Sequence, residues 1–286
     1  MPDARGPIEI SARVRASGGP YIPPKSRWGS LTGYTELIIL VHGYNRGELP
    51  IRDVYADTYG RLRDVLPLTM FENVATFYWP GDASRFWAPS AAAYFAKIGV
   101  AEACGRDLAD RLTETPPDGK KLTVWLIGHS LGCRLVLETV RHLRDSDRVQ
   151  VAGVLLMAAA VPEGLCEGER RYADRVAPAE VVLHSEADHI LKRWFTTGQL
   201  LARIARNEPD PGPHKGPVGL SGQPGRPRWD GMRDSVGLDH NQYWSSSNAI
   251  SQMAALVGNA RWREPASHQP DSRRPPEQWP ATRLAV

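Results

Sequence analysis

The stretch Leu122-Thr-Val-Trp-Leu-Ile-Gly-His-Ser-Leu-Gly132 decides the fold of this chain. Its apolar first half, residues 122–127, is typical of a buried strand, and residues 128–132 match the pattern G-x-S-x-G. After the pattern, apolar residues recur at helical spacing: Leu131, Leu135, Val136, Val140 and Leu143. A strand, a glycine-flanked turn and a helix in this order hold a serine exposed at the tip of a sheet. This setting, more than the short pattern itself, predicts that Ser130 is a nucleophile.

Strand-type and helix-type segments alternate on both sides of this stretch. Apolar runs predict strands at residues 37–41, 73–79, 122–127, 151–160 and 180–184. Helical periodicity predicts helices at residues 51–65, 90–112, 131–143 and 190–204. Such alternation implies right-handed crossovers, so we predict an α/β fold with a mostly parallel central sheet covered by helices on both faces. Residues 160–180 leave too little chain for a large cap domain.

Three regions differ in composition. We expect an N-terminal extension over residues 1–34, with one strand near residues 8–15 at an edge of the sheet. Residues 35–258 form the predicted α/β domain, and the Pro/Arg-rich tail, residues 259–286, is predicted to be disordered. Within the domain, residues 208–230 are rich in Pro and Gly and predict a long loop without secondary structure.

The 286 residues have ordinary globular composition, with 42% hydrophobic and 23% charged residues and a net charge of +3. Residues 141–148 and 167–171 mix charges of both signs, which indicates solvated faces and argues against a nucleic-acid partner. No N-terminal signal pattern and no apolar run of membrane-spanning length occurs, so we expect a cytoplasmic protein. The oligomeric state does not follow from these features.

The three cysteines, Cys104, Cys133 and Cys166, are an odd number at no metal-like spacing. They predict neither a disulfide framework nor a metal site. Cys133 follows the G-x-S-x-G turn and is expected to be a small buried residue. The histidines also lack the spacing of metal ligands, and serine chemistry requires no cofactor.

A serine nucleophile needs a base, and the base needs an acid that fixes its tautomer. On this scaffold the order along the chain is serine, acid, histidine. The strand at residues 180–184 is followed by two acids, Glu186 and Asp188. We predict Asp188 as the acid because its distance from the strand end allows a turn back across the sheet edge; Glu186 is the alternative.

Four histidines follow Asp188 in the chain: His189, His214, His240 and His268. His189 adjoins the acid, His214 lies among prolines, and His268 lies in the tail. His240 precedes a segment whose Ile250, Met253, Ala254 and Val257 form one helical apolar face. A histidine on the loop that enters this last helix can reach the serine, so we predict His240 as the base.

Negative charge that develops on an attacked carbonyl needs preorganised donors. The backbone N–H of Leu131 is one predicted donor, because it begins the helix after the turn. The N–H of Tyr44 is the other, because Gly43 lets the loop after the strand at 37–41 turn toward the site. His42 and His129 are interpreted as packing and hydrogen-bonding neighbours. Trp79 and Tyr243 are predicted to contact the substrate.

These pieces resemble bacterial α/β hydrolases of uncharacterised function that share a V-H-G-[YF]-N loop. The matching segments are Val41-His-Gly-Tyr-Asn45, Tyr78-Trp-Pro-Gly-Asp82, Leu126-Ile-Gly-His-Ser-Leu-Gly132, Ser185-Glu-Ala-Asp188 with Leu191, and His240 with Tyr243-Trp244. The resemblance spans about residues 35–258 and implies a triad of Ser130, Asp188 and His240. Asp239 departs from the pattern, because the family usually has a small residue before the histidine.

The expected function is therefore that of a serine hydrolase that cleaves a small-molecule carboxylic ester or thioester through an acyl-enzyme. Two alternatives remain at this point. An acyltransferase would use the same triad and differ only in the group that accepts the acyl chain. A non-catalytic binding protein would keep the turn without its chemistry.

Overall fold

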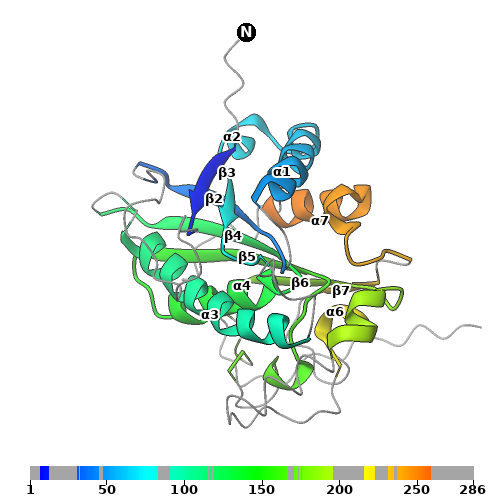
Figure 1. Cartoon of the computed structure of the whole chain (residues 1–286). Coiled ribbons are helices and arrows are strands. Elements are labelled where there is room, and N and C mark those ends of the chain that lie inside the picture. The colour runs from blue at the N-terminus through cyan, green and yellow to red at the C-terminus, as the bar shows by residue number, and fades with distance from the viewer. Residues whose placement is uncertain are drawn as a thin grey trace, which may run out of the picture.

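In the part of the chain that the structure describes, seven strands form one parallel sheet at the centre of the fold (Figure 1). The strand order is β1-β3-β2-β4-β5-β6-β7, and every adjacent pair is parallel. The computed structural model describes residues 7–12, 31, 33–44, 48–82, 91–114, 116, 119–166, 171–172, 174, 176–195, 216–222, 231–234 and 237–258. The predicted α/β class with a parallel sheet is confirmed.

The strands are β1 (Ile8–Ser11), β2 (Glu36–Val41), β3 (Val74–Tyr78), β4 (Leu122–His129), β5 (Val149–Met157), β6 (Ala179–His184) and β7 (Gly231–Asp234). All five strands predicted inside the domain are present. Their apolar runs are continuous because helices cover both faces of the sheet. Strand β7 was not predicted, because it has one apolar residue, Met232; it pairs with β6 at the end of the described strand order.

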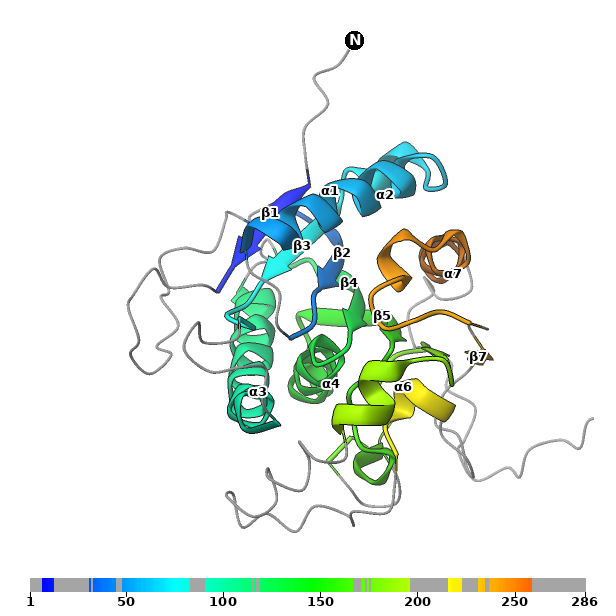
Figure 2. The same cartoon turned by 45° about the vertical axis from the view of Figure 1, so that its right-hand side comes forward.

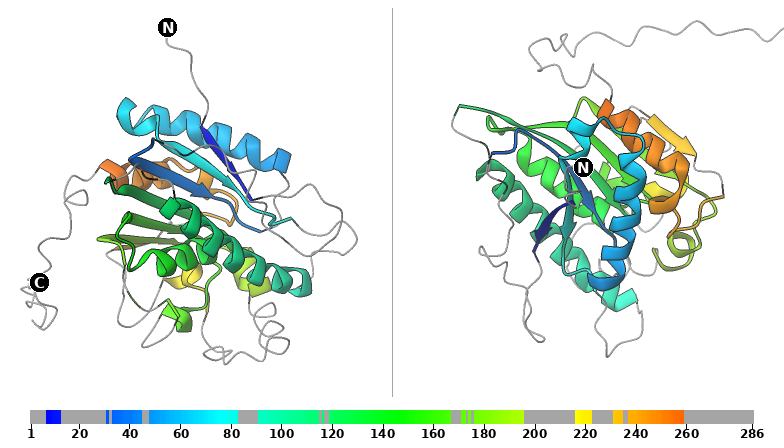
Figure 3. Two further views of the ribbon diagram at one scale, coloured as in Figure 1. Left: turned by 90° about the vertical axis from the view of Figure 1, so that its left-hand side faces the viewer. Right: turned by 90° about the horizontal axis from the view of Figure 1, so that it is seen from above.

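Helices cover the sheet in two layers, as Figures 2 and 3 show from other directions. α3 (Ala91–Glu114) and α4 (Gly132–Leu143) pack on one face, where they share a core with β2, β4 and β5. α1 (Glu48–Arg63) and α7 (Ser247–Gly258) pack on the other face. The shorter helical segments are α2 (Leu68–Phe71), η1 (Glu163–Cys166), η2 (Leu191–Phe195), α6 (Val218–Ser221) and η3 (Tyr243–Ser245). None of the described helices is long and apolar enough to cross a membrane.

The predicted loop at residues 208–230 is corrected in part, because it contains the one-turn helix α6. Backbone bonds attach this turn to the sheet: Val218 N–H donates to the Val161 carbonyl (2.9 Å) and Gly219 N–H to the Ala159 carbonyl (3.0 Å). A Cβ on Gly219 would lie 2.0 Å from the Ala159 nitrogen, so only glycine fits this contact. The rest of that loop, most of the predicted helix at 190–204, and the tail lie outside the described residues.

The strand order reverses between β2 and β4. The chain passes from β2 to β3 on one side, and then returns to place β4 on the other side of β2. Parallel α/β sheets bind ligands outside the carboxyl ends of the strands at such a point. The loops that begin there carry His42 after β2 and Ser130 after β4. Among the described residues, the β5–β6 connection contains the short turn η1 and no cap domain.

Candidate active site

Ser130 occupies a strained turn between β4 and α4. Its φ is 54°, in the left-handed region that residues other than glycine rarely adopt. Two backbone bonds to the neighbouring strand end hold it there: its N–H donates to the Met157 carbonyl (2.9 Å), and its carbonyl accepts from Ala160 N–H (3.1 Å). The turn therefore depends on β5 as well as on β4.

The glycines that flank this serine are required by close approach. A Cβ on Gly132 would lie 2.3 Å from the His42 carbonyl oxygen, and a Cβ on Gly128 would lie 3.0 Å from the Cys133 Cα. Backbone atoms cannot move aside as a flexible side chain can. The two positions therefore exclude any larger residue without a shift of the strand or helix, which explains the glycines of the pattern.

The structure brings Ser130, His240 and Asp188 together. His240 Nε2 lies 2.8 Å from Ser130 Oγ, and His240 Nδ1 lies 2.7 Å from Asp188 Oδ2. A carboxylate oxygen accepts hydrogen bonds, so Nδ1 carries the proton and donates a hydrogen bond to Asp188. Nε2 of a neutral ring is then an acceptor for the serine hydroxyl. The residues are 110 and 52 positions apart in the chain, so the fold alone unites them.

Asp188 reaches the histidine through a tight turn after β6. Its N–H donates to the Ser185 carbonyl (3.2 Å), and its second carboxylate oxygen accepts from the Leu191 N–H (2.8 Å). Asp188 is completely buried, whereas Glu186, the alternative acid, and His189 are exposed. Of the two acids that the sequence allowed, the geometry thus favours Asp188.

The loop that carries His240 is held through its backbone. The Asp239 carboxylate accepts from the His240 N–H (2.7 Å), and the Gln242 side-chain oxygen accepts from the Asp239 N–H (2.7 Å). The carboxylate that departs from the family pattern therefore braces the loop. The His240 carbonyl accepts a bond from His129 Nε2 at 2.6 Å, a contact that the sequence analysis did not anticipate.

The loop after β2 lies against the serine. A Cβ on Gly43 would lie 2.7 Å from Ser130 Cβ. His42 Nδ1 lies 2.8 Å from the Gly43 carbonyl, while His42 Nε2 accepts from the Trp79 N–H (3.3 Å). In a trans peptide the C=O and N–H point in opposite directions. Since the His42 ring holds the Gly43 carbonyl, the N–H of Tyr44 points away from that ring.

Leu131 directly follows the serine and precedes the first residue of α4. The first N–H groups of a helix have no partner within the helix, and the helix dipole adds partial positive charge there. The N–H of this residue therefore lies at a helix end where partial positive charge favours an anion. Burial also raises the pKa of the Tyr44 hydroxyl, which keeps that side chain uncharged.

The side chains of Trp79 and Tyr243, which the sequence predicts to contact substrate, lie inside the protein. Both side chains are fully buried. The Trp79 indole donates to the His42 carbonyl (2.7 Å) and stacks on the His42 ring, with centroids 5.6 Å apart. Tyr243 packs near the ring of His129 at 6.1 Å. Both side chains pack behind the loop after β2 and His240, and their contact with substrate stays a prediction.

A second buried polar cluster lies on the flank of α4, where the sequence predicted solvated faces. Glu138 is fully buried and accepts hydrogen bonds from the guanidinium groups of Arg141 and Arg171 at 2.9 Å each. The buried pair Arg134–Glu102 (2.8 Å) lies beside it. Arg141 stays exposed, as predicted for residues 141–148, and pairs with Glu138 three residues earlier on α4. The prediction of a solvated charge is wrong for Arg171, which is half-buried because Glu138 and Glu102, distant in the sequence, are its partners.

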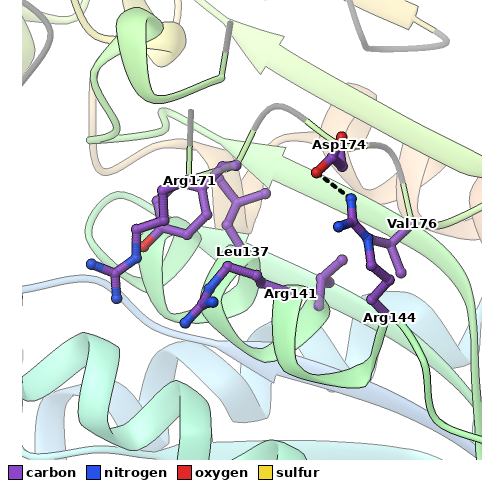
Figure 4. A pocket seen from close by; sticks show the side chains of 8 residues that line it. Leu137, Arg141, Arg144, Arg171, Asp174 and Val176 are labelled. Carbon is purple, nitrogen blue, oxygen red and sulfur yellow. Dashed lines mark ion pairs between the residues drawn. The ribbon is translucent and has the colours of Figure 1, made fainter. Parts of the chain in front are cut away.

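A small hollow lies next to this cluster (Figure 4). Its lining includes Leu137 and Val140 of α4, Arg144, which pairs with Asp174, and Val176. Ser130, His240 and Asp188 do not line this hollow. The hollow is therefore separate from the candidate active site.

Sequence comparison shows the class of this protein. The profile of the family described as alpha/beta hydrolase of unknown function (DUF900) matches residues 32–259. The chain belongs to this alpha/beta hydrolase family, as the resemblance of its motifs implied. Among curated proteins, none matches the chain.

Solved structures with a similar fold include an esterase of Pyrobaculum calidifontis, which is 15% identical. The match covers 79% of this chain and 76% of the esterase, with a TM-score of 0.43. YbtT, a type II thioesterase from the yersiniabactin NRPS/PKS pathway, is 13% identical, with 81% and 95% covered and a TM-score of 0.40. At these values neither likeness bears on the chemistry of the site.

Proposed function

We propose that this protein is a serine hydrolase that cleaves carboxylic esters or thioesters through an acyl-enzyme. The observation that carries the proposal is the continuous hydrogen-bonded series Asp188–His240–Ser130, with bonds of 2.7 and 2.8 Å. A hydroxyl that donates to a neutral imidazole, itself oriented by a buried carboxylate, is the arrangement that activates serine.

In the proposed first half-reaction, Ser130 Oγ attacks the carbonyl carbon while its proton moves to His240 Nε2. Asp188 stabilises the imidazolium through the bond to Nδ1. The N–H groups of Leu131 and Tyr44 are the proposed donors to the oxyanion. The imidazolium then protonates the leaving alcohol or thiol, and the acyl group stays on Ser130.

In the second half-reaction, water takes the place of the leaving group. His240 Nε2 accepts a proton from the water as its oxygen attacks the acyl carbonyl. The tetrahedral intermediate collapses, His240 returns the proton to Ser130 Oγ, and a carboxylic acid is released. Both half-reactions use the same donors, so one rigid site serves both steps.

Turnover of p-nitrophenyl esters of increasing acyl length tests this function. We expect hydrolysis by the wild type, and a loss of at least about 10⁴-fold in kcat for Ser130→Ala, since the nucleophile is removed. Ser247→Ala serves as a control, because this exposed serine at the start of α7 lies outside the Ser130–His240 contact. Equal turnover by Ser130→Ala and the wild type would refute the proposal.

A further inference from the structure

His129, the variable residue of the G-x-S-x-G pattern, contacts the candidate base directly. Its Nε2 lies 2.6 Å from the backbone carbonyl of His240, a residue 111 positions away. A carbonyl oxygen accepts hydrogen bonds, so His129 Nε2 carries the proton. The side chain is 3% exposed, and water therefore does not replace this bond. The residue before the nucleophile is thus bonded to the residue that supplies the base.

The two ends of this bond differ in how they are held. His129 is the last residue of β4, a central strand, and is in register with Met157 of β5. The His240 loop follows the short edge strand β7 and is braced by the local bonds of Asp239 and Gln242. The bond from His129 therefore joins a loop near the sheet edge to the centre of the sheet.

We propose that His129 is a positioning residue for His240 in the reaction proposed above. Asp188 fixes the Nδ1 side of the ring, and His129 fixes the backbone from which that ring extends. Two fixed points determine where Nε2 lies, and this atom is 2.8 Å from Ser130 Oγ. Small displacements of a reacting group cost large factors in rate, about 10²-fold for 1 Å.

The bond can be separated from the packing of the ring. His129 lies 5.9 Å from the Trp244 ring and 5.0 Å from the His240 ring, measured between centroids. His129→Phe keeps an aromatic ring in this space and removes the donor. His129→Gln loses the ring but offers an N–H donor at the end of a side chain of similar reach. A role in packing predicts that Phe is the better replacement, whereas a positioning role predicts Gln.

The experiment compares kcat and KM of both variants of the full chain with p-nitrophenyl ester substrates. We expect His129→Phe to lower kcat about 10- to 100-fold with KM within about 2-fold, and His129→Gln to recover most of the loss. His142→Phe, at an exposed histidine on the flank of α4, is the control and should keep wild-type kcat. Wild-type kcat in His129→Phe, or equal losses in Phe and Gln, would overturn the inference.

Histidine-ring NMR of the same proteins separates this inference from the proposed function. In the wild type, the His129 ring should show the Nε2–H form, and His240 a single set of ring signals. His129→Phe should broaden or double the His240 signals, and His129→Gln should restore one set. Unchanged His240 signals in His129→Phe would overturn the positioning role even if the wild type cleaves no ester. Absence of ester turnover with the expected signal changes would refute the function alone.

Discussion

Helix α4 carries buried polar residues at two places, Ser130 just before its N-terminal end and Glu138 about two turns later on its flank. At the first place, hydroxyl, imidazole and carboxylate form a linear series in which each bond joins two groups. At the second, a single carboxylate accepts from the guanidinium groups of Arg106, Arg141 and Arg171. Both are buried, yet they suit different tasks.

The difference lies in which groups can exchange a proton. Arginine stays protonated at any accessible pH, so the Glu138 cluster holds fixed charges and joins α4 to α3 and to residues 171–172. Histidine changes its charge near neutral pH, so the series at Ser130 can pass a proton. We infer that the flank of α4 stabilises the fold while its beginning performs the chemistry. Substitutions in the two places should therefore alter different quantities.

The largest expected effect is a loss of activity when the series Asp188–His240–Ser130, which ends at the beginning of α4, is interrupted. Asp188→Asn should lower kcat by about 10⁴-fold: its amide oxygen can still accept from the Leu191 N–H, but its NH2 group then donates toward His240 Nδ1, and the histidine adopts the wrong tautomer. The matched control is Glu186→Gln, an exposed acid two residues earlier, which should leave kcat within about 2-fold. Steady-state kinetics of the two variants measure this contrast. A large loss in Glu186→Gln with little loss in Asp188→Asn would reverse the assignment of the acid.

Substitutions on the flank of α4 should instead lower the stability of the folded protein. Burial alone would raise the pKa of Glu138, but hydrogen bonds and charges from Arg171 and Arg141 outweigh it and hold the pKa well below its usual range. Removing one partner of a buried ion pair costs about 3 kcal/mol or more. Glu138→Gln should therefore lower the free energy of unfolding by about 3 kcal/mol in urea denaturation, with kcat within about 3-fold.

The pH dependence of this stability has a defined sign. Because the pKa of Glu138 is lower in the folded state, its contribution is complete above the unfolded value of about 4.3 and is lost as the pH falls below it. The gap between wild type and Glu138→Gln should thus narrow below about pH 4. A gap that widens there, or a variant that loses activity without losing stability, would contradict the division between the two regions.

The smallest effect is expected at Cys133, which lies on α4 between the two clusters. Burial raises the pKa of this thiol, which also donates a hydrogen bond to the Met157 carbonyl (3.4 Å). The thiolate is the reactive form, so the thiol should resist reagents. Titration with a disulfide reagent at pH 8 should leave Cys133 unmodified in the folded protein and activity unchanged. Rapid modification of Cys133 with loss of turnover would contradict this expectation.

The sequence predicted much of the site because local signals and chain order coincide there. Ser130 lies in a recognisable motif, and both candidate acids follow the end of a predicted strand. His240 followed from eliminating the other histidines. The choice between Asp188 and Glu186 needed the three-dimensional turn after β6, since both lie within four residues of the strand.

The remaining features had no local signal. Among the described strands, β7 pairs with β6 alone, so four residues with a single apolar side chain suffice at that edge. Two partners of Glu138, Arg106 on α3 and Arg171, come from other parts of the chain, and mixed charge along the sequence gives no indication that they converge on it. Trp79 and Tyr243 are buried because the loop after β2 and the helix α7 close over them, which their residue types do not reveal.

The most direct test of the central claim is covalent labelling of the wild type with a fluorophosphonate, followed by peptide mass spectrometry. An activated serine attacks phosphorus and displaces fluoride, and this reaction needs no knowledge of the substrate. We predict one stoichiometric adduct on Ser130, absent in Ser130→Ala and strongly slowed in Asp188→Asn. An unlabelled wild type, or an adduct on another residue that persists in Ser130→Ala, would contradict the account.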